Sequence, residues 1–171
     1  MSETLSKIVC VAGASGTIGR AVVRECVSRG YAVTALLRSQ ESAHLPELTG
    51  ANMHLLIASE SQAVSRFVPL SATCVQRPHL AFQKAKLEFE AALKASALDH
   101  TIVRPTAFFK SLSGQGKRVA AGKPFLIFGD GTLTRCKPIS DADLARFIAN
   151  TLDHDAGRGA ELPIGGPGPA I

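Results

Sequence analysis

The sequence predicts an α/β fold built on a parallel sheet, and three observations support this prediction. Residues 7–12 form a short continuous apolar run, which is typical of a strand buried on both faces. A glycine-rich loop, Gly13 to Gly19, follows it, and apolar residues then recur with helical spacing from Arg20 to Arg29. Gly30 is placed to end that helix, and a second apolar run covers Tyr31 to Leu37. This order predicts a Rossmann-like, doubly wound parallel sheet.

The later elements follow the same alternation of strand and helix. Pro69 within the run 66–71 argues for an edge strand or a bulge, because proline cannot donate to a ladder. Ser140 and Asp143 form a near capping box at the start of a helix. The remaining expectations are a weak helix over 39–50, strands over 52–57, 66–71 and 101–104, long helices over 78–97 and 141–152, a β-hairpin over 125–137, and a short strand with a loop over 161–168.

Composition excludes several classes of protein. With 171 residues, of which 46% are hydrophobic and 19% charged, the chain is neither disordered nor membrane-spanning and fits one globular domain. Its net charge of +5 comes without the basic run of a nucleic-acid-binding groove. The cysteines have no metal-ligand spacing and are interpreted as core residues of a reduced, cytoplasmic protein, namely Cys10, Cys26, Cys74 and Cys136. The absence of a signal or transit peptide supports the same location.

The glycine loop carries the strongest chemical signal. Gly13 allows a tight turn, Gly16 lets the backbone approach a pyrophosphate, and Gly19 lets the helix pack closely. The start of the following helix supplies amide donors for the anion. Because the loop lies between an expected strand and an expected helix, it predicts a site for a dinucleotide cofactor.

Arg38 indicates which dinucleotide is bound. It ends the second expected strand, where an acidic residue would bind the ribose 2′-hydroxyl of NAD. A guanidinium suits a 2′-phosphate instead, so we expect NADPH. The alternative is a solvated arginine at the end of a strand.

The long helix over 78–97 places a lysine in an apolar stripe. Phe82, Lys86, Phe89 and Leu93 recur at i, i+4, i+7 and i+11 and therefore share one face. Lys86 either extends its ammonium to the surface or directs it at a ligand, and the spacing alone does not decide between the two.

Several blocks of sequence together resemble one known family. GASGTIGR after a strand, and F-x-x-x-K after a strand ending in Ser71, resemble an atypical short-chain dehydrogenase/reductase. The blocks LSATCVQRPHLAFQKAKLEFE, TIVRPTAFFKSLSGQ, GKPFLIFGDG, CKPISDADLARFI and LPIGGPG resemble the divinyl chlorophyllide a 8-vinyl reductase family. The resemblance covers residues 7–57 and 66–168. It implies NADPH-dependent reduction of the C8 vinyl group of a tetrapyrrole to ethyl in (bacterio)chlorophyll biosynthesis.

The resemblance also implies roles for individual residues. Lys86 matches the superfamily lysine that hydrogen-bonds the nicotinamide ribose and is the expected catalytic residue. Phe108 and Phe109 fall on the substrate side, with core packing as the alternative. In a single domain 1–171, residues from about 106 to 171 form the substrate-side portion. The expected cofactor-binding residues are Gly13, Ser15, Gly16, Thr17, Ile18, Gly19, Arg38, Ser71, Lys86 and Pro105.

Phe82 stands where the wider superfamily carries the tyrosine of Y-x-x-x-K. A phenyl ring cannot exchange a proton with a carbonyl or alcohol oxygen. Tyr31, the single tyrosine, starts the second expected strand and is therefore expected at the opposite end of the sheet from the glycine loop. Carbonyl reduction of the usual kind is therefore disfavoured, whereas reduction of a conjugated C=C bond is compatible with these residues.

Two parts of the family pattern are missing. Only nine residues separate Ile57 from Phe67, where the family has an acidic adenine contact, a strand and two helices, and the C-terminal region is also short. Nine extended residues reach about 30 Å, so the strand over 66–71 either closes up against the first strand or leaves a gap. Both arrangements leave a sheet face or edge uncovered, which predicts low stability or dependence on a partner.

Three hypotheses follow for function. The chain is an NADPH-dependent vinyl reductase of a phototrophic bacterium, an inactive NADP-binding sensor or assembly protein, or a truncated remnant. The expected partner is a small-molecule tetrapyrrole, with no nucleic acid and no transmembrane segment. The sequence leaves oligomeric state and peripheral membrane association open.

Overall fold

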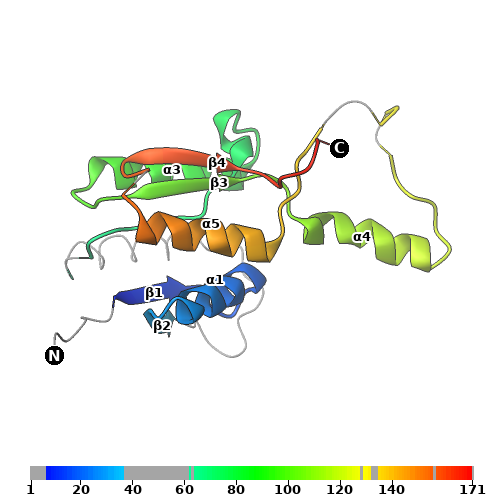
Figure 1. The fold of residues 1–171 in the computed structure, drawn as a ribbon. Coiled ribbons are helices and arrows are strands. Elements are labelled where there is room, and N and C mark those ends of the chain that lie inside the picture. The colour runs from blue at the N-terminus through cyan, green and yellow to red at the C-terminus, as the bar shows by residue number, and fades with distance from the viewer. Residues whose placement is uncertain are drawn as a thin grey trace.

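The structure, a computed structural model, describes residues 7–36, 62, 64–127, 129–131, 135–155 and 157–170. One or two helices separate each described strand from the next along the chain (Figure 1). The expected helix over 39–50, the expected strand over 52–57 and Arg38 lie outside the described residues. The elements are β1 Ile8–Ala12, α1 Thr17–Ser28, β2 Ala32–Leu36, the short 3₁₀ helix η1 Thr73–Gln76, α3 Ala81–Ala95, β3 Thr101–Pro105, α4 Phe109–Ala120, α5 Asp141–Asp153 and β4 Ala160–Ile164.

The strands pair in parallel, which confirms the predicted class of sheet. β1 pairs with β2 from Ile8 opposite Ala32 to Ala12 opposite Leu36. β3 pairs with β4 in the same sense. Parallel strands joined by helices are the arrangement of an α/β fold.

The segment 67–70 extends the β3–β4 sheet without being a regular strand. It forms two isolated parallel bridges, from Phe67 to His100 and from Leu70 to Val103. Between them the Val103 amide donates to the Pro69 carbonyl oxygen at 3.0 Å, but Pro69 has no N–H of its own to donate to β3. The proline therefore interrupts the ladder, as the sequence predicts.

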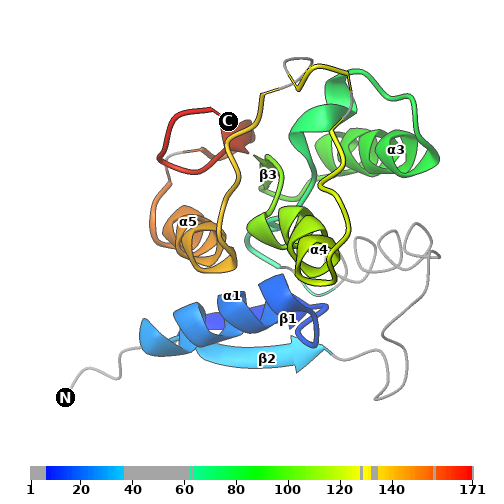
Figure 2. The same ribbon diagram turned by 90° about the vertical axis from the view of Figure 1, so that its right-hand side faces the viewer.

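The sequence allows the 66–71 segment either to close up against the first strand or to leave a gap beside it, and the structure has the gap. Within the described part of the chain, β1 pairs with β2, and no bridge joins β1 to the 67–70 segment. The two sheets are brought together instead by α1 and α5, which lie against each other (Figures 1 and 2).

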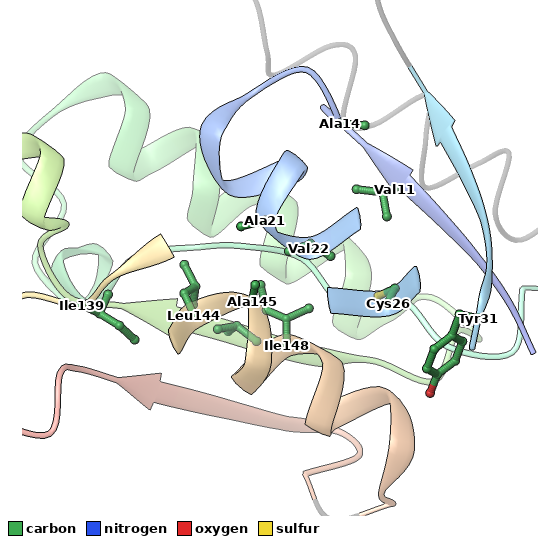
Figure 3. Close-up of a cluster of buried hydrophobic side chains, with 11 residues drawn as sticks. Val11, Ala14, Ala21, Val22, Cys26, Tyr31, Ile139, Leu144, Ala145 and Ile148 are labelled. Atoms are coloured by element: carbon green, nitrogen blue, oxygen red, sulfur yellow. The ribbon is translucent and has the colours of Figure 1, made fainter. Parts of the chain in front are cut away.

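The main core lies between α1 and α5 (Figure 3). Val22 and Cys26 of α1 face Leu144 and Ile148 of α5, and Val11 of β1 contributes from beneath α1. A second, smaller cluster lies between α3 and β3 and joins Leu93, Leu98 and Ile102, with Phe67 and Phe89 packed against it. Burial of these side chains contributes about 1.5–3 kcal/mol each to stability.

A polar cluster ties the far ends of α1 and α5 together. The Arg29 guanidinium donates to Glu25 in its own turn and, across the interface, to Asn150 at 2.8 Å and Asp153 at 2.6 Å. The Tyr31 hydroxyl donates to the other carboxylate oxygen of Asp153. Because these groups are partly buried, their pairing adds geometric specificity to the apolar contact.

Several expectations are wrong. Residues 125–127 and 135–137 form no strands, so the expected hairpin is not made there. Instead, α4 precedes this stretch, a helix that the sequence analysis does not anticipate. Of the four cysteines, Cys26 alone is buried, whereas Cys10 and Cys74 are exposed and Cys136 is half-buried. Among the helices in the described ranges, none combines the length and the apolar character that a bilayer-crossing segment requires.

Candidate functional site

The glycine loop has the backbone geometry that its spacing predicts. Gly13 has φ +74°, a left-handed conformation that favours glycine, and the Gly16 amide closes the turn on the Gly13 carbonyl oxygen at 3.0 Å. A Cβ on Gly19 would overlap that oxygen and come within 2.8 Å of the Gly13 carbonyl carbon. The absence of a side chain at Gly19 therefore lets the first turn of α1 lie directly on the loop.

The N-terminus of α1 is open to an anion. Gly16 is the N-cap and offers no side-chain oxygen to the first-turn amides, and the first turn of α1 contains no acidic residue. At α5, by contrast, the Ser140 hydroxyl accepts from the Asp143 amide at 3.0 Å and two aspartates occupy the first turn. The unsatisfied amides and the helix dipole favour a negative group at α1, whereas α5 is already capped.

A cavity of about 250 Å³ joins the α1 N-terminus to residues expected on the substrate side. Phe108 lines it and is half-buried, so one of its faces also packs on the main core. Phe109, the other expected substrate residue, is 55% exposed and does not line this cavity. The lining residues are Thr17, Ile18, Phe108, Lys110, Ser111 and Asp141.

Lys86 and Ser71 meet where the 67–70 segment ends. The Lys86 ammonium donates to the Leu70 carbonyl oxygen at 2.8 Å, so it turns inward rather than extending to the surface. Burial lowers the pKa of Lys86, and the charges of Glu90 and Cys74 oppose this effect. Ser71 is 6% exposed, and within the described structure its hydroxyl oxygen is buried without a hydrogen-bond partner. An unsatisfied buried hydroxyl costs free energy unless a ligand or water completes it.

The residue that replaces the superfamily tyrosine lies on the surface. Phe82 is 49% exposed near the start of α3, one turn before Lys86 on the same face. Tyr31 lies at the opposite end of the sheet from the glycine loop, next to the Ala32 amide that donates to Lys7. Burial, together with the hydrogen bond to Asp153, raises the pKa of Tyr31 to about 12. The lone tyrosine thus supports the α1–α5 interface and is too far along the sheet to serve the loop.

A second cavity, of about 350 Å³, opens beyond the ends of β3 and β4. Its two cations, Arg135 and Lys137, are not candidate site residues from sequence, because they are spaced like ordinary surface cations. Pro105, an expected cofactor residue, is buried at the end of β3 immediately before this cavity. The lining residues are Thr73, Thr106, Ala107, Arg135, Cys136, Lys137, Pro163, Ile164, Gly165 and Ala170.

Comparison with known proteins assigns the chain to a family. The model of a family described as NAD(P)H-binding matches residues 47–155. A relative from Cucumis sativus named divinyl chlorophyllide a 8-vinyl-reductase, chloroplastic, is 39% identical over 225 residues, covering 95% of this chain and 54% of the relative. A reductase of the same name from Oryza sativa subsp. indica is 38% identical over 223 residues, with 95% and 55% coverage. The chain therefore spans about half the length of these relatives.

The length of the alignment identifies an internal deletion. The aligned stretch has 225 positions and this chain has 171 residues, so at least 54 positions of the Cucumis relative have no counterpart within the aligned part. A more distant relative, the Photosystem II assembly factor Ycf39 of Guillardia theta, is 24% identical over 201 residues and covers 91% of this chain and 64% of the relative.

Solved structures share the fold at low sequence identity. The Citrobacter sp. triphenylmethane reductase complexed with NADP(H) has a TM-score of 0.76 at 13% identity, covering 95% of this chain and 70% of that one. An Escherichia coli NADPH-dependent quinone oxidoreductase complexed with NADPH has a TM-score of 0.75 at 15% identity, with the same coverage. These similarities support the Rossmann-like fold despite the gap between the two sheets.

The described residues fit a dinucleotide in two respects. The glycine loop leaves a cradle without side chains before an uncapped helix N-terminus, which suits a pyrophosphate. The orphaned Ser71 hydroxyl and the inward-turned Lys86 ammonium offer polar groups at the carboxyl end of a parallel segment, where ligands of α/β sheets bind. The chain belongs to the NAD(P)H-binding family.

Proposed function

We propose that this chain binds NADPH and carries the reductase site for the C8 vinyl group of divinyl chlorophyllide a. The observation that carries the proposal is the shared cavity in which the α1 N-terminus meets Phe108, because it places a cofactor loop beside an aromatic wall. The curated relatives at 38–39% identity carry the name of this activity. Since the chain spans about half of their length, activity of the chain on its own is part of the proposal.

In the proposed complex, each cofactor contact has a physical reason. The amides of Thr17 and Ile18, with the backbone of Gly13, Ser15 and Gly16, receive the pyrophosphate, while Gly19 keeps α1 close. Arg38 receives the 2′-phosphate. At the other end, Lys86, Ser71 and Pro105 border the nicotinamide ribose, and the bound cofactor supplies a hydride.

Phe82 selects the reaction in this proposal. A carbonyl substrate needs a proton donor at its oxygen, and Phe82 has none to offer. In a conjugated vinyl group the macrocycle delocalises the charge that develops, so the proton is added later from water or another group. We propose that residues 106–171 form the substrate side of a single domain, because members of this stretch line both cavities. Phe108 and Phe109 are the proposed apolar contacts for the pigment ring.

A glycine substitution tests the cofactor site. Gly19→Ala forces a Cβ into the Gly13 carbonyl, so we expect NADPH affinity measured by calorimetry to fall at least about tenfold. Gly114→Ala is the matched control, because that glycine is also helical and a Cβ there meets nothing within 4 Å. Equal NADPH affinities for the two variants would show that the glycine loop is not part of the cofactor site.

A second substitution tests the choice of cofactor. Arg38→Ala is expected to weaken NADPH binding about 10- to 100-fold, because charged hydrogen bonds contribute about 1.5–3 kcal/mol. NADH, which lacks the 2′-phosphate, should bind both proteins alike. Equal loss for both cofactors would show that Arg38 acts on the fold and not on the phosphate.

Turnover separates the competing functions. Divinyl chlorophyllide a with NADPH should give a monovinyl product, seen as a shift of the Soret band, and deuterium from labelled NADPH should appear in the new ethyl group. NADPH binding without turnover would favour the sensor or assembly alternative, to which the assembly-factor relative gives some support. Absence of both would favour a remnant. A cytoplasmic location in a phototrophic bacterium stays a prediction, and the curated reductases are named chloroplastic.

A further inference from the structure

We infer that α4 and the segment after it, residues 109–127, form a docking arm for an anionic lipid surface. We call these residues the α4 arm. The arm begins beside the first cavity, since Lys110 and Ser111 line it, and it runs away from α5 and the sheets (Figure 1). The inference rests on the side chains of the arm. Phe109, its first residue, is also a proposed contact of the pigment ring, and the variants that test the arm leave it unchanged.

The α4 arm exposes an unusual amount of apolar surface. Five of its large apolar side chains are between 47% and 64% exposed, and of the α4 residues whose side chains are described, none is buried. Scattered exposed apolar residues are ordinary, but three of these five, at 125–127, are consecutive in the chain, and a contiguous group marks an interaction site. The five are Phe109, Val119, Phe125, Leu126 and Ile127.

The charge of the arm selects its partner. Residues 106–129 contain no aspartate or glutamate, although the whole chain has 14. They contain four cations, namely Lys110, Lys117, Arg118 and Lys123. A helix and loop that combine exposed apolar side chains with cations and no anions have the composition of an interfacial membrane-binding element. Anionic lipid headgroups complement this charge.

Hydrogen bonds within the arm fix the backbone that carries its exposed apolar side chains. The Gln115 side chain accepts a hydrogen bond from the Leu126 amide and donates one to the Leu126 carbonyl oxygen, each at 3.3 Å. The Arg118 guanidinium donates to the Pro124 carbonyl oxygen at 2.9 Å. The backbone after α4 is thereby fixed along the helix, while Phe125 and Ile127 stay free to enter a lipid interface. Their insertion would require little ordering, which favours binding.

Vesicle sedimentation with the full chain tests the inference. Vesicles of phosphatidylcholine with phosphatidylglycerol should bind the protein, vesicles of phosphatidylcholine alone should bind it weakly, and added salt should release it. Removing Lys117 and Lys123 together by substitution with Gln should lower the partition coefficient by about fivefold for each charge. Phe125→Ser with Ile127→Ser should lower it by about tenfold or more.

Matched variants keep the test specific to the arm. Arg24→Gln with Lys84→Gln removes the same charge from exposed sites on α1 and α3, and Ile8→Ser removes an exposed apolar side chain from β1. These should bind vesicles like the unsubstituted chain, with circular dichroism confirming the fold of each variant. Equal loss in arm and control variants, or no preference for anionic vesicles, would overturn the inference. A lipid-free dimer that Ile127→Ser dissociates would also overturn it, because the occupant would then be a second copy.

Discussion

β1 and β3 are both five-residue strands, each paired in parallel with one neighbouring strand, yet their surroundings differ. All five residues of β3 are buried, since Ile102 packs towards α3 and Val103 packs towards α5. In β1, Val11 is buried under α1, but the residues of the opposite face, Ile8, Cys10 and Ala12, are exposed. A parallel strand needs cover on both faces, and only β3 has it.

The less covered half is also the half that adjoins the internal deletion. The Cucumis sativus relative carries at least 54 positions within the aligned stretch that this chain lacks, and the family resemblance places the shortening between the expected third strand and the 67–70 segment. The C-terminal half thus buries β3 on both faces, while in the described residues the half with the glycine loop packs on it mainly through α1 against α5.

The largest expected effect lies in the well-covered half. Arg104 of β3 pairs with Glu90 of α3, which is 2% exposed, and also with Glu161 of β4. Glu90→Leu leaves a buried guanidinium short of a partner and should cost about 3–5 kcal/mol of unfolding free energy in urea. The exposed neighbour Glu88→Gln should cost almost nothing. If Glu90→Leu were harmless, β3 would not be anchored in the manner described.

Two isoleucines compare the strands directly. Ile102 is fully buried in β3, and Ile8 is 78% exposed in β1. Ile102→Ala should cost about 2–5 kcal/mol and Ile8→Ala less than about 0.5 kcal/mol, both measured by urea unfolding. Similar losses at the two sites would mean that the outer face of β1 is covered in solution, and the contrast between the strands would fail.

A smaller effect concerns the polar link between the halves. Burial and Asp153 raise the pKa of Tyr31 from 10 to about 12, so the unfolded chain loses its phenolic proton first. This contribution to stability is complete below pH 10 and is lost as pH rises from about 10 to about 12. Tyr31→Phe should remove that slope and cost about 1 kcal/mol at neutral pH.

The titration can be read without ambiguity. Tyr31 is the only tyrosine and the chain has no tryptophan, so tyrosinate absorbance reports this group alone. The hydrogen bond from Tyr31 also lowers the pKa of Asp153, with help from Arg29, so stability supplied by this pair should fall in acid below the ordinary aspartate range. A tyrosinate titration midpoint near pH 10 in the native protein would show that the hydrogen bond from Tyr31 to Asp153 of α5 is not formed.

Local signals predicted the parts of the fold that local chemistry determines. The Gly13 turn, the close approach at Gly19 and the Ser140 cap each depend on a few neighbouring residues, and the structure has them. α4 was not predicted, because Gly114 and Gly116 break its pattern and its side chains have no core to face. The expected hairpin around Gly129 failed for a related reason, since Gln115 and Arg118 bind the backbone that a strand would have used.

The site was predictable in part. The glycine loop and Phe108 were named from sequence, and the structure brings them to one cavity. The spacing on α3 favours a local pair between Glu90 and Lys94, whereas in the fold they pair with Arg104 and Glu161. Such partners are distant in sequence, so helical spacing carries no signal for them. Arg135 and Lys137, which line the second cavity, carried no signal either, because they are spaced like ordinary surface cations.

Hydrogen–deuterium exchange of the full chain, with and without NADPH, tests the central claim that the weakly covered half holds the cofactor. In the free protein, amides of β1 and α1 should exchange faster than those of β3, because they open with less loss of buried surface. NADPH should slow exchange in the loop from Gly13 to Gly19 and in α1, and leave β3 unchanged. Equal protection of β1 and β3 without cofactor, or no change in the loop on adding NADPH, would contradict the account.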